Sequence, residues 1–255
     1  MRNRGFGMKR SFIWIGVVLV VLALLFMPDA ALAAPGGKIV SGLIKTPWGK
    51  ALMIVLGVIL SPIIAYVVIQ EYRAQKRTMA QLRRLAVIDP RFDWIQLKDR
   101  ATDCYHRVHS AWRAEDMAQA SEWMTGWYWQ NQQLAHLNQW ERDGLVNHCR
   151  VKSISSMRPL FLKYERAEDG SSDGSRVVLS ITASMEDYLA ERASGRIVEG
   201  RKGYADTEHI WTFVLQQGKW VVANIEEGSM SLMYARLKPE VPENLPASQV
   251  LTTVV

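Results

Sequence analysis

A run of nineteen residues without a charged side chain, Ala51 to Ile69, constrains this chain more than any other feature. As an α-helix it would be about 28 Å long, close to the thickness of a bilayer's hydrocarbon core. Buried helices of soluble proteins are usually shorter, and this run is followed by a one-sided cluster of cations. The sequence therefore predicts a transmembrane helix over residues 51–70. The flanking cations are Arg73, Lys76, Arg77, Arg83 and Arg84.

A second apolar run, Ser11 to Met27, follows four cations and precedes a stretch of small residues. This order is typical of a secretory signal, and Ala31 and Ala33 match the A-x-A cleavage pattern. Residues 1–33 are predicted to be a signal peptide removed after Ala33, with a retained first membrane anchor as the alternative. Residues 34–50 then form a short non-cytoplasmic segment.

The distribution of cations predicts the orientation in the membrane. Four precede the first run, three lie between the two runs, and five follow the second. Because cytoplasmic flanks carry the excess of Lys and Arg, the C-terminal part is expected on the cytoplasmic side of a bacterial inner membrane. In a mitochondrion the corresponding side is the matrix.

The formal net charge of +6 does not indicate a nucleic-acid partner. Residues 1–88 carry twelve Lys and Arg against two acidic residues, a net +10, while the remainder carries nineteen against twenty-three, a net −4. The soluble part therefore has no basic footprint for a phosphate backbone. Two cysteines, Cys104 and Cys149, are too few for a disulfide framework or a zinc site, which is compatible with a reducing compartment.

Residues 71–89 are predicted to form a basic amphipathic stalk. Such a stalk either lies along anionic lipid headgroups or only obeys the positive-inside rule. Pro90 ends it, so a separate domain is expected over residues 90–237. The proline-containing residues 238–255 are expected to be a disordered tail.

The domain begins with helical periodicity. Asp93 is a plausible N-cap, and a first helix carries Trp94, Leu97, Ala101, Cys104, Val108 and Trp112 on one face. A second helix is expected to carry Met117, Ala120, Met124 and Trp127, and a third Leu134, Leu137 and Trp140. That third helix ends at Gly144.

After Gly144 the apolar period changes to two. Alternate positions from Val177 to Met185 are apolar, which predicts a strand with one buried face, and a turn at Gly218 predicts a hairpin. The charged stretch Ala190–Gly203 is expected to be a mobile loop. Helices followed by strands indicate an α+β domain, with a curved antiparallel sheet and helices packed on it. One or two N-terminal hydrophobic membrane segments precede this domain.

Aromatic residues are the candidate binding groups. Trp123, Trp127, Tyr128 and Trp129 lie within seven positions, and Trp123 and Trp127 are expected to share one helical stripe. Core packing explains such a cluster, and so does an open pocket or a membrane-facing surface. The candidates for a ligand or lipid site are Trp123, Trp127, Tyr128, Trp129, Trp211 and Trp220.

Catalytic signals are weak. Asp103, His106 and His109 lie within two turns of one helix, but no third metal ligand is marked out, so no metal and no cofactor is predicted. Asp187 and Tyr188 could supply a base and a hydroxyl, without evidence that they converge. The sequence contains no phosphate loop and no nucleophile elbow. No catalytic residue is assigned.

The pieces together resemble the Tim44-like domain, a family named for a subunit of the mitochondrial import motor. The resemblance runs from about Asp93 to Tyr234 and includes the Gly144–Leu145 turn. Its other motif residues are Glu208, Ile210, Trp211, Phe213, Trp220 and Ile225.

The resemblance implies a fold similar to nuclear transport factor two, with an apolar pocket, on a domain peripheral to the inner membrane with affinity for anionic lipid such as cardiolipin. In the import motor, the N-terminal region recruits a heat-shock chaperone, and this chain has two hydrophobic segments there instead.

The resulting hypothesis is a non-enzymatic, inner-membrane-anchored adaptor that binds lipid or a membrane protein and acts in membrane protein biogenesis or translocation. Its partners would be anionic phospholipid and a protein of the inner membrane, with no nucleic acid. One alternative is an isomerase or dehydratase that uses Asp103, His106 and Tyr188 in the pocket. Another is a structural subunit of a secretion or respiratory complex.

Overall fold

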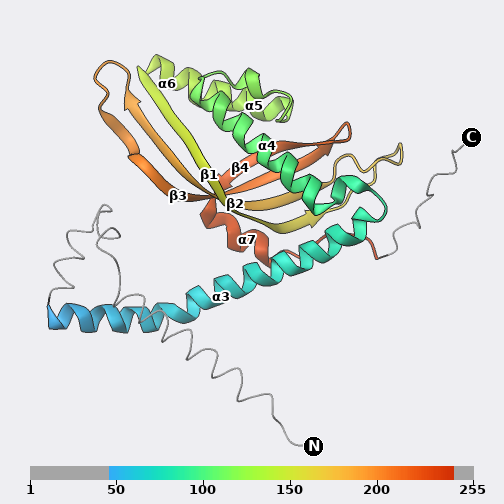
Figure 1. The fold of residues 1–255 in the computed structure, drawn as a ribbon, viewed down its shortest axis with the longest axis horizontal. Helices are drawn as coiled ribbons and strands as arrows, with labels where there is room; N and C mark the ends of the chain where they lie inside the picture. Colours follow the sequence, from blue (N-terminus) through green and yellow to red (C-terminus); the bar gives the residue numbers. More distant parts are fainter. Residues whose placement is uncertain (1–45, 244–255) are drawn as a thin grey trace, which may run out of the picture. The chain divides into compact units, whose positions relative to one another are not determined.

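The computed structural model describes residues 46–243, which are drawn in colour in Figure 1. The predicted signal peptide or first anchor (1–33) and residues 244–255 lie outside the described part of the chain. The chain divides into two compact units, Met1–Gln70 and Glu71–Val255, and each is described by itself.

Helix α3 runs from Pro47 to Ala86 and contains a stretch long and apolar enough to cross a membrane. Its first half does not have the covered surface of a core helix in a soluble protein, because large apolar side chains are exposed along it. This exposure favours a membrane helix. The side chains more than 40% exposed include Leu52, Val55, Leu56, Val58, Ile59, Leu60, Ile63, Ile64, Val68 and Ile69.

Pro62 lies inside α3 and lacks the N–H that would bond the carbonyl of Val58. The Ser61 hydroxyl donates to that carbonyl at 2.9 Å, so the oxygen keeps a partner. In the hydrocarbon of a bilayer no water can replace a lost backbone bond. The Ser61 bond therefore makes proline tolerable in a spanning helix.

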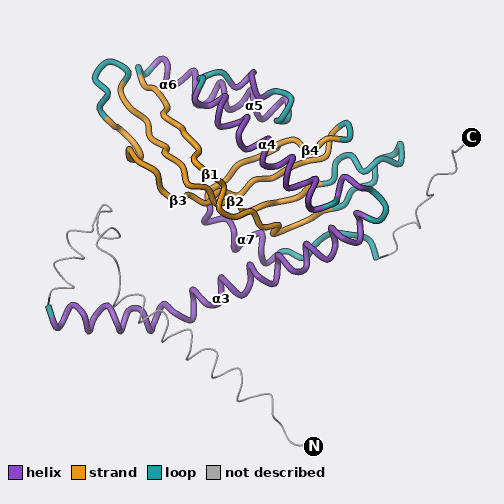
Figure 2. Tube along the Cα trace, in the orientation of Figure 1, coloured by secondary structure: helices purple, strands orange, loops and turns teal. Residues whose placement is uncertain are grey.

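Four antiparallel strands form one sheet in the order β1-β2-β3-β4 (Figures 1 and 2). Register shifts interrupt all three pairings. Such bulges bend a strand and increase its twist, which explains the curvature of these long strands. The strands are β1 (Leu145–Lys163), β2 (Arg176–Glu191), β3 (Ile197–Gln216) and β4 (Lys219–Glu227).

The buried face predicted for β2 is confirmed, but the opposite face, expected to be wet, is partly buried as well, at Val178 and Ser180. The sheet face that carries its apolar positions packs against helix α4 (Trp94–Arg113) and is called the inner face below. The predicted first helix is confirmed as well, with the Asp93 carboxylate accepting from the N–H groups of Ile95 and Gln96. The buried inner-face residues of β2 are Val177, Leu179, Ile181, Ala183 and Met185.

The expected second helix is wrong. A 3₁₀ turn, η3 (Met117–Ala120), ends well before helix α5 (Gly126–Gln132) begins. Between them Met124 forms a bridge with Val222 of β4, so the chain is extended where a helix was expected. Helix α5 continues through the π-helical turn η4 (Gln133–Leu137) into α6 (Asn138–Arg142).

The stretch Ala190–Gly203, expected to be a mobile loop, is largely strand. β2 continues to Glu191 and β3 begins at Ile197, across a turn closed by the Gly195 N–H, which donates to the Glu191 carbonyl at 2.8 Å. A Cβ at Gly200 would stand 2.5 Å from the carbonyl oxygen of Asp187. This glycine therefore allows close strand pairing and does not indicate disorder.

The predicted hairpin around Gly218 is confirmed as the β3–β4 turn. Gln217 and Gly218 both have positive φ, 49° and 73°, as a tight two-residue hairpin turn requires. The Asp173 carboxylate accepts from both backbone N–H groups, at 2.6 and 3.1 Å. The loop that joins β1 to β2 thereby fixes the end of the hairpin.

The opposite side of the sheet, called the outer face below, carries a smaller apolar cluster. Two short helices pack on it, η5 (Gly228–Met230) and α7 (Ser231–Arg236). Their Met230 and Tyr234 contact the buried side chains of the cluster. These are Leu160, Phe161, Val178 and Ile210.

The second half of α3 is built into the same unit. Leu82 and Leu85 are buried and belong to the main core. Thr78 is buried, and its hydroxyl donates to the Leu160 carbonyl at 3.1 Å. One side of the predicted stalk is therefore packed against the domain.

An ionic network joins α3 to the outer face. Arg158 of β1 contacts the Glu71 carboxylate of α3 at 2.9 Å and the Glu208 carboxylate of β3 at 2.7 Å. The Ser231 hydroxyl of α7 donates to the other oxygen of Glu71 at 2.6 Å. The network connects two strands and two helices that lie far apart in the sequence.

Replacing Arg158 by methionine leaves the Glu71 carboxylate, only 10% exposed, without its cation. We expect the free energy of unfolding to fall by about 2 to 3 kcal/mol, less than for a fully buried pair because Arg158 and Glu208 are about one-third exposed. Urea unfolding of the full chain in mild detergent, followed by tryptophan fluorescence, measures the change. Arg150→Met, at an exposed position of the same strand, is the control. Equal midpoints for both variants would contradict a stabilising network.

Candidate binding surfaces

The centre of the inner face is filled by aromatic rings. Trp211 and Phe213 of β3 and Tyr105 of α4 are all fully buried. The ring centroids of Tyr105 and Trp211 are 4.8 Å apart, and those of Trp211 and Phe213 6.2 Å. Trp211, a candidate for the ligand or lipid site, therefore lies in the core.

Trp220 and Tyr128 are also buried, and both use their polar atoms inside the protein. Trp220 Nε1 donates to the Arg91 carbonyl at 2.8 Å, and its ring meets that of Phe92 edge-on at 5.5 Å. The Tyr128 hydroxyl accepts from the Ile225 N–H at 2.8 Å. Burial raises the pKa of Tyr128 to about 12. These two rings tie helices to β4.

Trp123 and Trp127 do not share a helical stripe, which corrects the sequence expectation. Trp123 lies in the segment before α5, half-buried, and its Nε1 donates to the Asp103 carboxylate at 2.6 Å. The Arg107 guanidinium carbon lies 4.9 Å from the centroid of the Trp123 ring, a cation–π contact. Trp129 is half-buried and packs against the core.

Trp127 of α5 is 72% exposed, and Leu134 of η4, seven residues further along the chain, is 64% exposed. With the exposed Gln130 between them they form what we call the α5 surface. From Gly126 to Trp140 the chain has no Asp, Glu, Lys or Arg. The α5 surface is thus apolar at its centre and surrounded by amides.

A small cavity of about 230 Å³ opens between α4 and β1. Burial lowers the pKa of His109 to about 3, and its ring stacks on Tyr105 with centroids 4.2 Å apart. Burial raises the pKa of the Cys149 thiol to about 12. The imidazole and the thiol are therefore uncharged near neutral pH. The lining residues are His106, His109, Ser110, Arg113, Cys149 and Val151.

The candidates for an enzymatic site are held apart. Asp103 is engaged by Trp123, Arg100 and Arg107, away from the cavity that His106 lines. Tyr188 stacks on His148 at 4.5 Å, on the sheet face opposite its neighbour Asp187.

Asp187 lies near Tyr105 and Cys149, and its pKa is raised by burial and by Glu199. Tyr105 and Cys149 come from elements distant in sequence, so local spacing gave no signal for them. Among the described residues, no group of three His, Cys, Asp or Glu side chains is placed to hold a metal ion.

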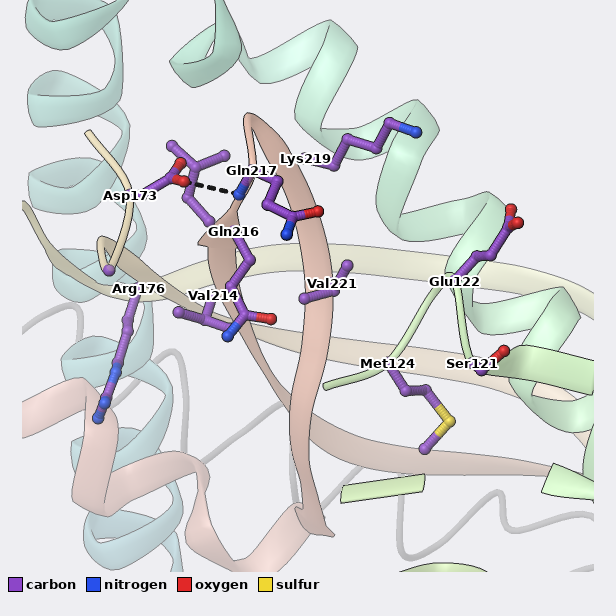
Figure 3. Close-up of a pocket in the computed structure, with 12 residues that line it drawn as sticks. Ser121, Glu122, Met124, Asp173, Arg176, Val214, Gln216, Gln217, Lys219 and Val221 are labelled. Carbon is purple, nitrogen blue, oxygen red and sulfur yellow. Dashed lines mark hydrogen bonds between the residues drawn. The ribbon is translucent and has the colours of Figure 1, made fainter. Parts of the chain in front are cut away.

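A larger cleft of about 880 Å³ lies beside the β3–β4 turn (Figure 3). Its floor contains Val214 and Val221, and Arg176, Lys219 and Glu122 stand around it. Asp173 also lines it, but its carboxylate is occupied by the turn, as described above. Charges of both signs and amides give this cleft no single chemical preference.

The five basic residues after the apolar run are used in two ways. Arg73, Lys76 and Arg83 are exposed, and the Lys76 ammonium stands 4.6 Å from the centroid of the Tyr72 ring. Arg77 donates to the carbonyls of Ala235 and Leu237, and Arg84 to those of Pro242 and Glu243. Two of the cations thus hold the C-terminal segment.

A long curved antiparallel sheet with helices on its inner face belongs to the α+β folds that resemble nuclear transport factor two. The model of the Tim44-like domain matches residues 78–227, more than half of the chain. The chain therefore belongs to the Tim44-like domain family. The match begins inside α3, earlier than the start near Asp93 suggested by the sequence. Members are generally non-enzymatic, and the family indicates a membrane-associated role of the adaptor or translocation type.

Other comparisons add little. No curated protein matches the sequence. Among solved structures, the intermembrane space region of the chloroplast protein ARC6 aligns with a TM-score of 0.36 and 9% identity, over 50% of this chain and 92% of that one. A likeness of this level carries no functional argument.

The lowered pKa of His109 should make the stability of the domain depend on pH. The ordinary pKa is 6.5, so between about pH 6.5 and pH 3 the unfolded chain binds more protons than the folded one. Stability present above pH 6.5 is therefore lost as the pH falls. Between pH 7 and pH 5, the wild type should lose up to about 2 kcal/mol more free energy of unfolding than His109→Phe. Phenylalanine keeps a stacked ring without a titrating group. Urea titrations at the two pH values measure this difference, and equal losses would refute the assignment.

Proposed function

We propose that this protein is a membrane-anchored, non-enzymatic adaptor whose Tim44-like domain binds a membrane protein. The observation that carries the proposal is the continuity of α3. Its first half exposes large apolar side chains over the length of a bilayer, and its second half contributes Leu82 and Leu85 to the domain core. Residues 51–70 then form the span, and the domain cannot diffuse away from the membrane.

The cation distribution supports placing the domain on the cytoplasmic side of a bacterial inner membrane, or in the matrix of a mitochondrion. Five cations follow the span and three precede it. Residues 1–33 are then a signal peptide or first anchor, and residues 34–50 face the opposite side.

A reporter enzyme that works only in the cytoplasm should be active when it is fused after Val255, because the positive flank stays inside. Alkaline phosphatase, which needs the periplasm, should be inactive at the same position. Reversed activities would refute the orientation. Extraction of the chain by alkaline carbonate would refute the span itself.

The α5 surface supports a protein partner. It is exposed, centred on an aromatic ring, and free of the charges that would attract anionic headgroups. Protein interfaces favour tryptophan anchors surrounded by uncharged polar groups. Because the domain is tethered, we infer that the partner is another protein of the same membrane.

The geometry gives less support to an enzyme. Asp103, His106 and Tyr188 do not converge, and the cavity between α4 and β1 is lined by a neutral imidazole and a protonated thiol. General acid–base catalysis needs groups within hydrogen-bond reach of a shared substrate. Binding at the α5 surface therefore explains the arrangement better than catalysis.

A photo-crosslinking amino acid in place of Trp127 should give a discrete adduct with a membrane protein in native membranes. The same amino acid in place of Ile95, an apolar residue 68% exposed on α4, is the matched control. Trp127→Ala should reduce co-purification of that partner in mild detergent without changing the unfolding midpoint. Adducts with lipid alone, or equal adducts at both positions, would overturn the α5 surface as the partner site.

A further inference from the structure

The short helix α7 is fixed beside the first turns of α3 that follow the predicted span. The Ser231 hydroxyl donates to the Glu71 carboxylate at 2.6 Å. Arg77 donates to the carbonyls of Ala235 and Leu237, at 2.9 and 3.5 Å. α7 and the residue after it thus lie along α3 between the levels of Glu71 and Arg77.

The α3 residues that hold α7 follow the apolar run closely in the sequence. With a rise of about 1.5 Å per residue, Glu71 and Arg77 lie about 3 and 12 Å beyond Ile69 along the helix. The headgroup layer on each side of a bilayer is about 5 to 7 Å thick. If the hydrocarbon ends near Ile69, the α3 residues that hold α7 lie in the headgroup layer and just beyond it.

α7 has two different sides. Tyr234 packs on the outer-face cluster and Ala235 is fully buried, so these residues face the protein. Met233 of α7 and Leu237, which directly follows the helix, are 45% and 42% exposed. Apolar side chains that face outward at headgroup depth are typical of an interfacial helix.

Exposed cations stand on α3 and directly after this pair, with the exposed Glu240 two residues further on. Arg73 and Lys76 of α3 are exposed, and Lys238 directly follows Leu237. Arg73 lies one turn before Arg77 on the same stripe of α3, the stripe that bonds the C-terminal segment. This charge is complementary to anionic phospholipid, in contrast to the uncharged α5 surface.

We propose that α7 contacts the membrane surface, with Met233 and Leu237 inserted among the headgroups of an anionic bilayer and Arg73, Lys76 and Lys238 paired with lipid phosphates. The proposal rests on the membrane anchoring proposed above. It assigns the lipid contact to the C-terminal helix and leaves the α5 surface for protein.

The test uses the full chain with Met233→Cys, labelled with an environment-sensitive fluorophore and reconstituted into vesicles. Native Cys104 and Cys149 are buried, and burial raises the pKa of each thiol to about 12, so labelling at neutral pH is selective. Wild-type chain treated with the same reagent measures background. Trp127→Cys, carrying the same label, is the control position.

With phosphatidylglycerol in the vesicles, the label at position 233 should shift to shorter wavelength. A lipid with a nitroxide near the headgroup should quench it, and both effects should weaken in pure phosphatidylcholine. The label at position 127 should report water in both vesicles. The double variant Met233→Glu with Leu237→Glu is read by a label at Lys238→Cys. In this variant, quenching of that label should no longer depend on phosphatidylglycerol. Val87→Glu, which alters an apolar residue 79% exposed elsewhere, should leave that dependence intact.

Carbonate extraction of the same vesicles separates two kinds of failure. A chain that resists extraction, with an unquenched label at position 233, overturns the α7 contact and leaves the anchoring intact. A label shielded from water but unquenched shows that a protein surface or a second copy covers α7, which also overturns the contact. A chain released by carbonate overturns both the anchoring and the contact that rests on it.

Discussion

The bonds made by Arg158 determine how α3 meets the sheet. Its guanidinium reaches Glu71 and Glu208, and Glu71 also accepts from Ser231. A shielded ion pair adds little net stability over an apolar replacement, but a broken one is costly. The network joins Glu71 of α3 and Ser231 of α7 to the outer face, although the buried Nε of Arg158 has no hydrogen-bond partner among the described residues. These bonds place the Glu71 turn of α3 on the domain.

Several of the candidate aromatic residues use their polar atoms inside the protein, whereas Trp211 is fully buried and its Nε1 has no hydrogen-bond partner among the described residues. Trp220 and Tyr128 bond backbone groups from buried positions, and Trp123 donates to Asp103. Such bonds let large rings enter a core without stranding a donor. Among the six candidate residues, Trp127 is the exposed one, at 72%. Exposure of a single large ring on an uncharged helix therefore has no explanation in the core, which is why we assign it to binding.

Charge separates the two surfaces proposed for contact. The surface proposed at α7 combines the apolar Met233 and Leu237 with cations, whereas the α5 surface has no charged side chain from Gly126 to Trp140. A lipid headgroup layer attracts the first kind of surface, and a protein interface tolerates the second. One domain can then contact its membrane and its partner at the same time through different helices.

The sequence by itself determined the candidate span, the side of the charge excess, helix α4, the buried face of β2 and the Gly218 hairpin, because each depends on neighbours along the chain. It could not separate Trp211, a core ring, from Trp127, a surface ring, since neither the residue type nor its neighbours along the chain record burial. It also grouped Arg77 with the other flanking cations, although its partner, the Ala235 carbonyl, lies 158 residues away. Contacts of that separation leave no local pattern, so only the tertiary structure decided which rings and charges remain available for binding.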